Sequence, residues 1–369
     1  METGDDILAI EEDEKGSGKK GLFKKIFWFV FRIGLAAAII GWLISSKYTK
    51  VAKGLDNFNY FWLIPAALFY GLHMFACAWR WYELSKVLDI KISLRDAVSL
   101  TMIAYFSSLV IPGGAIGGDL AKIGFLNSRT PKGAKLEGAF TVLFDRIVGM
   151  LGLFSTAIVI ILLTIPLLMS IDYPYLAKLN ISPWMMRAGM IATLLGLCVF
   201  GLVAMMAIFY HKLLEKIKPI GFLMKLADKY TNNAVSRMTA ATDVYKNHLK
   251  LFSMMTLVTV IFVDLNLVLV VFFIAKGLGI VDIQLMSLAA AVIIGSIAGL
   301  IPLTISGVGI RDATVYAILT AGGFSASMTM TIPLIYTALI LAFNILAGLF
   351  FVFGGIKKKQ FRELTGKSQ

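Results

Sequence analysis

An apolar stretch from residue 97 to 126 is interrupted by Ile111-Pro112-Gly113-Gly114-Ala115-Ile116-Gly117-Gly118-Asp119. A second apolar stretch, from 287 to 320, is interrupted by Ile301-Pro302-Leu303-Thr304-Ile305-Ser306-Gly307-Val308-Gly309-Ile310-Arg311-Asp312. Proline removes a helical hydrogen bond and glycine weakens a helix, so each stretch is predicted to form a helix, a break and a second helix. The alternative is a continuous helix that proline and glycine only kink. Repetition of the pattern in two places favours the broken form.

Long apolar runs surround the two broken segments. The chain of 369 residues is 58% hydrophobic and 15% charged, with a mean hydropathy of +0.82, which is far from the composition of a soluble domain. A membrane-spanning helix needs about 20 apolar residues. The runs of that length are 26–46, 60–79, 139–165, 185–210, 251–275 and 327–353. The sequence therefore predicts an all-α polytopic membrane protein with six full spans and two broken segments, eight apolar segments in all.

Basic residues in the connecting loops predict the sidedness of the segments. The 211–250 loop and the C-terminal tail are basic and should be cytoplasmic, whereas the 276–284 loop is nearly neutral and should be external. Both ends of the first broken segment are basic, so both should be cytoplasmic, and both ends of the second should be external. We therefore predict two opposed re-entrant hairpins, at about 97–126 and 287–320. Two short complete spans in place of each hairpin would give the same sidedness.

The order of the segments predicts an inverted repeat. The span 60–79, the first hairpin and the span 139–165 correspond, upside down, to 251–275, the second hairpin and 327–353. One feature opposes this topology: Lys47, Lys50 and Lys53 would lie outside, against the usual bias.

The predicted organisation is one membrane domain between two tails. Residues 1–25 form an acidic and then basic tail, expected to be disordered, and residues 356–369 form a basic tail. Residues 26–355 form the membrane domain, in a cell membrane with both termini cytoplasmic. The 211–250 loop alternates lysines with apolar residues, which predicts an amphipathic helix on an anionic leaflet or a topology signal alone. Trp79 and Trp81 are expected to lie in an aromatic belt at the membrane interface.

The two breaks predict a polar site inside the membrane. Irregular backbone is tolerated at membrane depth only where it is buried in protein or lines a watery cavity. A helix that begins at such a break offers unpaired N–H groups to an anion such as phosphate, and Lys122 and Arg311 follow the two breaks. In the alternative interpretation, Asp119 and Asp312 cap the second helices and pair with these two bases. The candidate substrate-binding residues are Gly113, Gly114, Gly117, Gly118, Asp119, Lys122, Asp145, Arg146, Ser306, Gly307, Gly309, Arg311 and Asp312.

Acidic residues inside the spans have two possible roles. Asp264 lies near the centre of the 251–275 run, where an unpaired acid costs about 2.5–3.5 kcal/mol. It is the candidate for ion coupling, with a structural hydrogen bond as the alternative. Asp145 and Arg146 lie nearer the cytoplasmic end of their span, where a local ion network is the alternative to substrate binding.

Several chemistries lack their motifs. Gly113–Gly118 has the glycine spacing of a nucleotide phosphate loop, but Asp119 and Leu120 stand where Lys and Ser/Thr are required. The three histidines are scattered, without metal-ligand spacing. The net charge of +13 is divided among short blocks, which does not favour a nucleic-acid partner. We expect no cofactor, no metal and no ATP-driven step.

The chain resembles the flippase-like family of the lysylphosphatidylglycerol synthase transmembrane region. The resemblance rests on the glycine motif that ends in Asp119, the pair Asp145-Arg146, and Ser306-Gly307-Val308-Gly309-Ile310-Arg311-Asp312. In the family the three acids are often Glu, and Arg is common where Lys122 stands. The resemblance implies movement of a phospholipid or lipid-linked phosphate headgroup between leaflets. It does not imply synthesis, because only about sixteen residues follow the last span and leave no room for an aminoacyl-transferase domain like that of the full synthase.

Two other functions remain open from the sequence. Enzymes that act on polyprenyl phosphates also use opposed hairpins, but this chain lacks the Ser-Arg sequence of their phosphate loop. A transporter of a small solute is the second. The sequence does not identify the lipid, the direction of transport or the oligomeric state.

Overall fold

The computed structural model describes residues 55–56, 58–111, 114–127, 135–171, 182–216, 222, 226, 228, 230–231, 233–300 and 309–354. All regular elements in these ranges are helical. The predicted first span 26–46, both predicted tails and the candidate residues Gly113, Ser306 and Gly307 lie outside the described residues.

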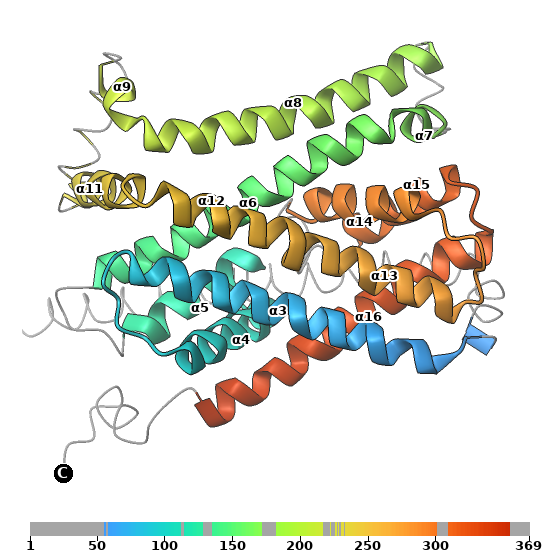
Figure 1. Cartoon of the computed structure of the whole chain (residues 1–369), viewed down its shortest axis with the longest axis horizontal. Helices are drawn as coiled ribbons and strands as arrows, with labels where there is room; N and C mark the ends of the chain where they lie inside the picture. The colour runs from blue at the N-terminus through green and yellow to red at the C-terminus, as the bar shows by residue number, and fades with distance from the viewer. Residues whose placement is uncertain are drawn as a thin grey trace, which may run out of the picture.

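Five helices in the described ranges are long and apolar enough to cross a membrane. They are Tyr60–Lys86 (η1, Tyr60–Trp62, and α3, Leu63–Lys86), α6 (Lys135–Leu163), α8 (Pro183–Phe209), Leu249–Gly277 (α12, Leu249–Val258, η4, Thr259–Asp264, and α13, Leu265–Gly277) and α16 (Ala326–Gly354). These helices coincide with five of the six predicted runs, and the all-helical membrane class is confirmed. Figure 1 shows α6 and α16 crossing α3 and α12–α13 at an angle, with α8 on the outside of the bundle.

The first broken segment forms a pair of short helices that pack against each other. α4 (Leu94–Val110) starts at a capping box, in which Ser93 and Asp96 bond each other's backbone N–H groups. α5 (Ala115–Asn127) returns along it, and Gly118 lies so close to the carbonyl of Ala104 that a Cβ atom would collide with it. Glycine at this position lets the two backbones touch.

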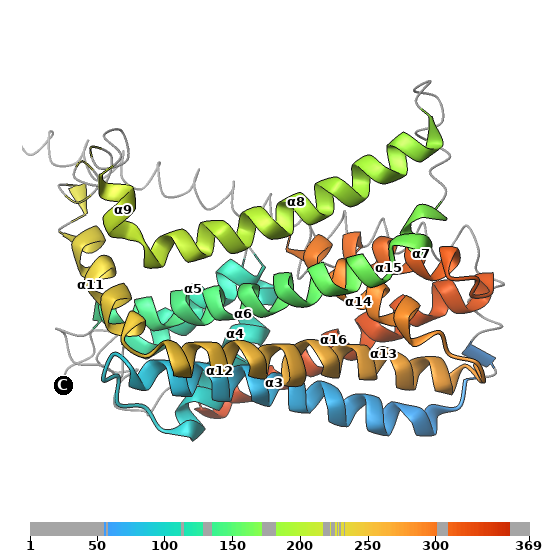
Figure 2. The ribbon, with the colours of Figure 1, turned by 45° about the horizontal axis from the view of Figure 1, so that its top comes forward.

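The second broken segment has the same form. α14 (Leu285–Gly299) and α15 (Ile310–Ala321) pack antiparallel, since Gly322 beyond the end of α15 meets Ser287 near the start of α14. Gly309 precedes α15 with φ of 96°, which favours glycine. Figures 1 and 2 show the α4–α5 pair and the α14–α15 pair in opposite halves of the bundle.

The α4–α5 and α14–α15 helix pairs pack in different apolar clusters. Buried residues of α14, from Leu288 to Ile294, belong to the largest apolar cluster together with α13 and α16. The first pair packs in a smaller cluster around Trp81, Leu100 and Leu126. Trp81 has an exposed fraction of 0%, so its predicted place in an aromatic belt is wrong. Its indole N–H donates to Thr141, which allows the ring to be buried.

Two helices from the 211–250 loop lie at one end of the bundle, namely α9 (His211–Glu215) and α11 (Ala234–Lys246). α11 packs on the long helices, because buried Tyr245 donates to the carbonyl of Leu84 and Arg237 pairs with Glu137. α11 is therefore docked on protein along the face that carries its buried residues. A short helix, α7 (Ile165–Met169), follows α6.

Candidate functional site

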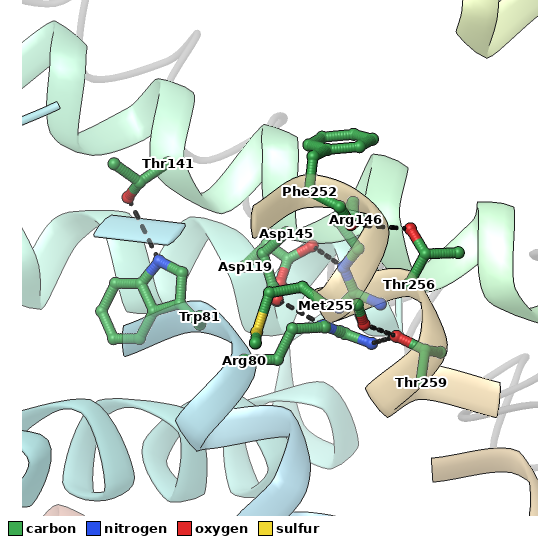
Figure 3. A network of polar contacts seen from close by, with 10 residues as sticks. All are labelled: Arg80, Trp81, Asp119, Thr141, Asp145, Arg146, Phe252, Met255, Thr256 and Thr259. Atoms are coloured by element: carbon green, nitrogen blue, oxygen red, sulfur yellow. Dashed lines mark hydrogen bonds and ion pairs between the residues drawn. The ribbon is translucent and has the colours of Figure 1, made fainter. Parts of the chain in front are cut away.

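A buried ion pair joins α3 to α6. Arg80 Nε donates to Asp145 Oδ1 at 2.8 Å, and both side chains are almost completely buried. Arg80 Nη1 donates to Thr259 Oγ1 at 2.9 Å, so the guanidinium also reaches η4 (Figure 3). Loss of one partner of such a pair leaves an uncompensated buried charge, which is strongly destabilising. Arg80 therefore fixes the relative position of three helices.

A second ion pair joins α5 to α6. Arg146 binds both carboxylate oxygens of Asp119, with Nε at 2.5 Å and Nη2 at 2.8 Å, and also donates to the carbonyl of Ala115 at 3.3 Å. The Arg146 side chain is 40% exposed. The Arg146–Asp119 pair is therefore accessible from outside the protein, whereas the Arg80–Asp145 pair is buried. The contacts of Arg146 with Asp119 and with Ala115 hold the start of α5 against α6.

Lys122 follows Asp119 by three residues in α5, but its partner is an aromatic ring and not a carboxylate. Its Nζ lies 3.6 Å from the centroid of the Trp81 ring, a cation–π contact, and the residue is 3% exposed. Among the described residues it forms no ion pair with a carboxylate. It stands roughly 10 Å along the axis of α5 from Ala115, about two turns beyond the start of the helix.

The charges of this first cluster do not balance. Arg80, Arg146 and Lys122 contribute three positive charges, and Asp119 and Asp145 contribute two negative ones. The described residues of α3, α5 and α6 at this point therefore carry an excess of one positive charge, and the buried one without a carboxylate is Lys122.

The second cluster lies at the start of α15 and is balanced. Asp312 accepts from the N–H of Gly309 at 2.9 Å and from Thr337 of α16 at 2.6 Å. Arg311 donates to the same carboxylate at 3.3 Å and to Thr337 Oγ1 at 2.5 Å, and its guanidinium lies over the ring of Tyr336. Asp312 thus caps the helix and pairs with Arg311, as the alternative interpretation predicted for this break.

Asp264 belongs to neither cluster. It ends η4, a π-helical turn of six residues, and is 4% exposed. Thr156 Oγ1 of α6 lies 2.9 Å from its Oδ2. Single π turns inside α-helices occur frequently at functional sites.

Comparison with known proteins adds one result. The model of the family described as the lysylphosphatidylglycerol synthase TM region matches residues 29–348. The chain belongs to this family. No curated protein and no solved structure matches it. Membership in the lysylphosphatidylglycerol synthase TM family makes the chain a membrane protein with a lipid-related context, and the resemblance seen in the sequence is confirmed.

In this family member, the structure brings together most of the residues predicted from the sequence. Asp119, Lys122, Asp145 and Arg146 share the first cluster, with Gly114, Gly117 and Gly118 in the same hairpin. Gly309, Arg311 and Asp312 share the second.

Sequence reasoning missed the partners that complete these clusters. In the sequence, Arg80 is only one of the basic residues that precede the first broken segment and predict its sidedness, and Trp81 is only a predicted interface residue. A base directly after the 60–79 run, matched by an acid inside the 139–165 run, was a signal that could have identified the Arg80–Asp145 pair. Thr156, Thr259 and Thr337 carried no such signal. Among the described residues no group of three or more His, Cys, Asp or Glu side chains is arranged to hold a metal.

Proposed function

We propose that this protein translocates a phospholipid or a lipid-linked phosphate headgroup between the leaflets of a cell membrane, without ATP hydrolysis and without a chemical step of its own. The observation that carries the proposal is buried Lys122, which lies against Trp81 and has no carboxylate partner among the described residues. A buried ammonium is costly without an anion. A phosphate that reaches it restores the balance of the first cluster, while the acyl chains stay in lipid.

The route to Lys122 runs along the exposed pair Arg146–Asp119. Arg146 is the accessible cation of the cluster, and it holds the start of α5. A phosphate competes with Asp119 for the two N–H groups that now form the bidentate contact. Arg311 serves the other leaflet in this proposal, after it leaves Asp312.

Opposed hairpins supply the alternating access. We propose that α4–α5 and α14–α15 are re-entrant, that they enter from opposite sides, and that the domain is an inverted repeat. The element order supports this: α3, α4–α5 and α6 are followed, after α8 and α11, by α12–α13, α14–α15 and α16. Both termini and the 211–250 loop are cytoplasmic in this arrangement, and the loop faces an anionic leaflet.

The test uses purified protein in phosphatidylcholine vesicles with a trace of tail-labelled fluorescent lipid, whose outer-leaflet fraction is bleached by dithionite. Phosphatidylglycerol carries the phosphate, and glucosylceramide with the same label lacks it. Lys122→Gln should slow translocation of phosphatidylglycerol about 10- to 100-fold, since hydrogen bonds to charged groups contribute about 1.5–3 kcal/mol. Lys122→Arg should retain much of the activity.

The matched control is Lys91→Gln, which neutralises an exposed lysine outside the cluster. It should translocate like the native protein. Native-like rates for a folded Lys122→Gln protein would contradict the proposed site, and equal native rates for both labelled lipids would contradict phosphate recognition.

A further inference from the structure

Two contacts from α3 hold the π-helical turn η4 that ends in Asp264. Arg80 Nη1 donates to Thr259 Oγ1 at its first residue, and His73 Nδ1 lies 3.1 Å from the carbonyl oxygen of Val263. A carbonyl oxygen only accepts, so the Nδ1 atom of His73 carries the hydrogen. The turn is thereby fixed at both ends from one side.

α6 contacts the same turn from the other side. Gly152 packs directly against the side chain of Thr259, with no room for a Cβ atom. One helical turn further on, Thr156 reaches Asp264. Among the described residues, the carboxyl of Asp264 therefore meets one hydroxyl group, that of Thr156, in a position that the packing of α6 on η4 determines.

A count of hydrogens at Thr156 indicates the protonation state of Asp264. Thr156 Oγ1 lies 2.9 Å from the carbonyl oxygen of Gly152 and 2.9 Å from Asp264 Oδ2. A hydroxyl has one hydrogen to donate, and both neighbours are acceptors if Asp264 is a carboxylate. One of the two short oxygen–oxygen contacts would then contain no hydrogen. A protonated Asp264 removes the conflict, because it donates to Thr156 and Thr156 donates to Gly152.

The charged groups near η4 do not offset this conclusion. Within the described residues Asp264 forms no ion pair. From α3, Arg80 is already bound to Asp145 and Thr259, and His73 is satisfied as a neutral imidazole, with Nδ1–H toward Val263 and Nε2 3.5 Å from the hydroxyl of Tyr105. The ionisable residues of α6 nearest in sequence to Thr156 are paired in the first cluster, and α12 and α13 carry charge only near their outer ends, at Lys250 and Lys276.

We propose that Asp264 holds a proton in this conformation, donated to Thr156, and that release of this proton is the ion-coupled step of translocation. The inference rests on the function proposed above and names its coupling ion. Release converts the carboxylic acid into a carboxylate and delivers one proton to water. The Thr156 hydroxyl then turns from Gly152 to the carboxylate.

The new carboxylate also acts on the first cluster. Arg80 already contacts the turn through Thr259, so ionised Asp264 competes with Asp145 for the guanidinium. Any weakening of the Arg80–Asp145 pair loosens α6, which carries Arg146 next to the start of α5. Proton release and the hold on the α4–α5 hairpin are linked through one arginine.

The protonation state is tested by infrared difference spectroscopy, which does not depend on transport. The native spectrum minus that of Asp264→Asn should contain the C=O stretching band of a protonated carboxylic acid in neutral buffer. Thr156→Val removes the acceptor of this proton and should shift the band to higher frequency. Thr193→Val is the matched control, because Thr193 bonds its own helix at Gly189 on exposed α8; the band should not move. Absence of the band in the native protein would overturn the proposal and indicate a shared hydrogen bond from Thr156 to an ionised Asp264.

Coupling is tested with the same vesicles under an imposed pH gradient. If one proton moves with each lipid, a gradient of one pH unit should sustain about a tenfold difference in the concentration of labelled phosphatidylglycerol between the two leaflets. Asp264→Asn should keep downhill exchange and lose the asymmetry. A band together with an unchanged asymmetry in Asp264→Asn would overturn the coupling role. A native protein that moves no labelled lipid would contradict the proposed function and its coupling, whereas the infrared band would still decide the protonation state.

Discussion

The two hairpins differ in how their charges are satisfied. The polar residues at the start of α15 form a closed group: Asp312 binds Gly309, Arg311 and Thr337, and the charges balance. The cluster beside α5 is spread over α3, α5 and α6 and keeps Lys122 without a carboxylate among the described residues. Glycines, an acid and a base occur at both breaks. At the start of α15 they form a paired group that holds the helix start, whereas beside α5 they leave one buried cation without a carboxylate among the described residues.

This difference assigns the hairpins separate tasks in the conformation described. Among the described residues, the group at the start of α15 pairs Arg311 with Asp312 and stabilises the start of the helix. An unbalanced buried cation is unfavourable until an anion arrives. In the proposed function, the first hairpin can therefore accept a phosphate in this conformation, and the second must first break its own contacts.

The largest expected effect concerns the opposed orientation of the hairpins, without which the comparison has no functional meaning. Single cysteines replace Lys132, after α5, and Ser325, after α15, in a protein without its native cysteines. In intact cells, a membrane-impermeant maleimide applied outside should label Ser325→Cys and leave Lys132→Cys unlabelled until the cells are opened. Labelling of both positions from the same side would end the inverted-repeat proposal.

Removal of Asp145 should have the largest effect on stability. Asp145→Ala leaves Arg80 buried without its partner and should lower the free energy of unfolding by about 3–5 kcal/mol. Thermal unfolding in detergent measures the loss. The double variant Arg80→Leu with Asp145→Leu should recover most of it, because an apolar pair carries no uncompensated charge. A single variant as stable as the native protein would show that this pair does not hold α3 to α6.

A smaller effect is expected where the halves of the hairpins touch. Gly118→Ala places a methyl group against the backbone carbonyl of Ala104 and should cost about 1–3 kcal/mol of stability. Gly295→Ala, in the other hairpin, meets the side chains of Val315 and Arg311, which can shift, and should cost less. Gly124→Ala is the control, since nothing lies within 4 Å of its Cβ position, and it should be neutral or slightly stabilising. Equal losses of stability in Gly118→Ala and Gly295→Ala would show that the backbone contact at Gly118 is no tighter than the side-chain contacts at Gly295.

The smallest effect is expected for the exposed pair of the first cluster. Asp119→Asn keeps the size of the side chain and removes its charge. Because Arg146 is 40% exposed, the variant should lose less than about 1 kcal/mol of stability. Phosphatidylglycerol should reach the freed Arg146 more readily, which would appear as a lower lipid concentration for half-maximal translocation. A large loss of stability would show that the Arg146–Asp119 pair contributes to stability as much as a buried ion pair does.

The sequence predicted the helical elements well, because each depends on local composition. Runs of about 20 apolar residues identify spans, and proline with glycine identifies the breaks. The partners of the charged residues were harder to predict, because pairing depends on which helices touch. Lys122 is three residues from Asp119, a spacing that brings side chains together on a helix, yet Arg146 of α6 takes that carboxylate and Lys122 turns to Trp81.

The threonines show the same limit more clearly. In a sequence, Thr156, Thr259 and Thr337 look like ordinary small residues of membrane helices. Their importance comes from the one acid or arginine that each meets on another helix. Arg80 was visible as a charge directly after the 60–79 run, but only the crossing of α3 with α6 and η4 shows that one guanidinium bonds to both.

The docking of α11 has a practical consequence for measurements of motion. Tyr245 and Arg237 fasten α11 to the ends of α3 and α6, the helices that the Arg80–Asp145 pair holds together. A spectroscopic label on the outer face of α11 should therefore move together with the ends of α3 and α6. A distance from it to a label on α3 or α6 reports whether the Arg80–Asp145 pair still holds these helices together, and a distance from it to a label on α5 reports movement of the α4–α5 hairpin relative to them.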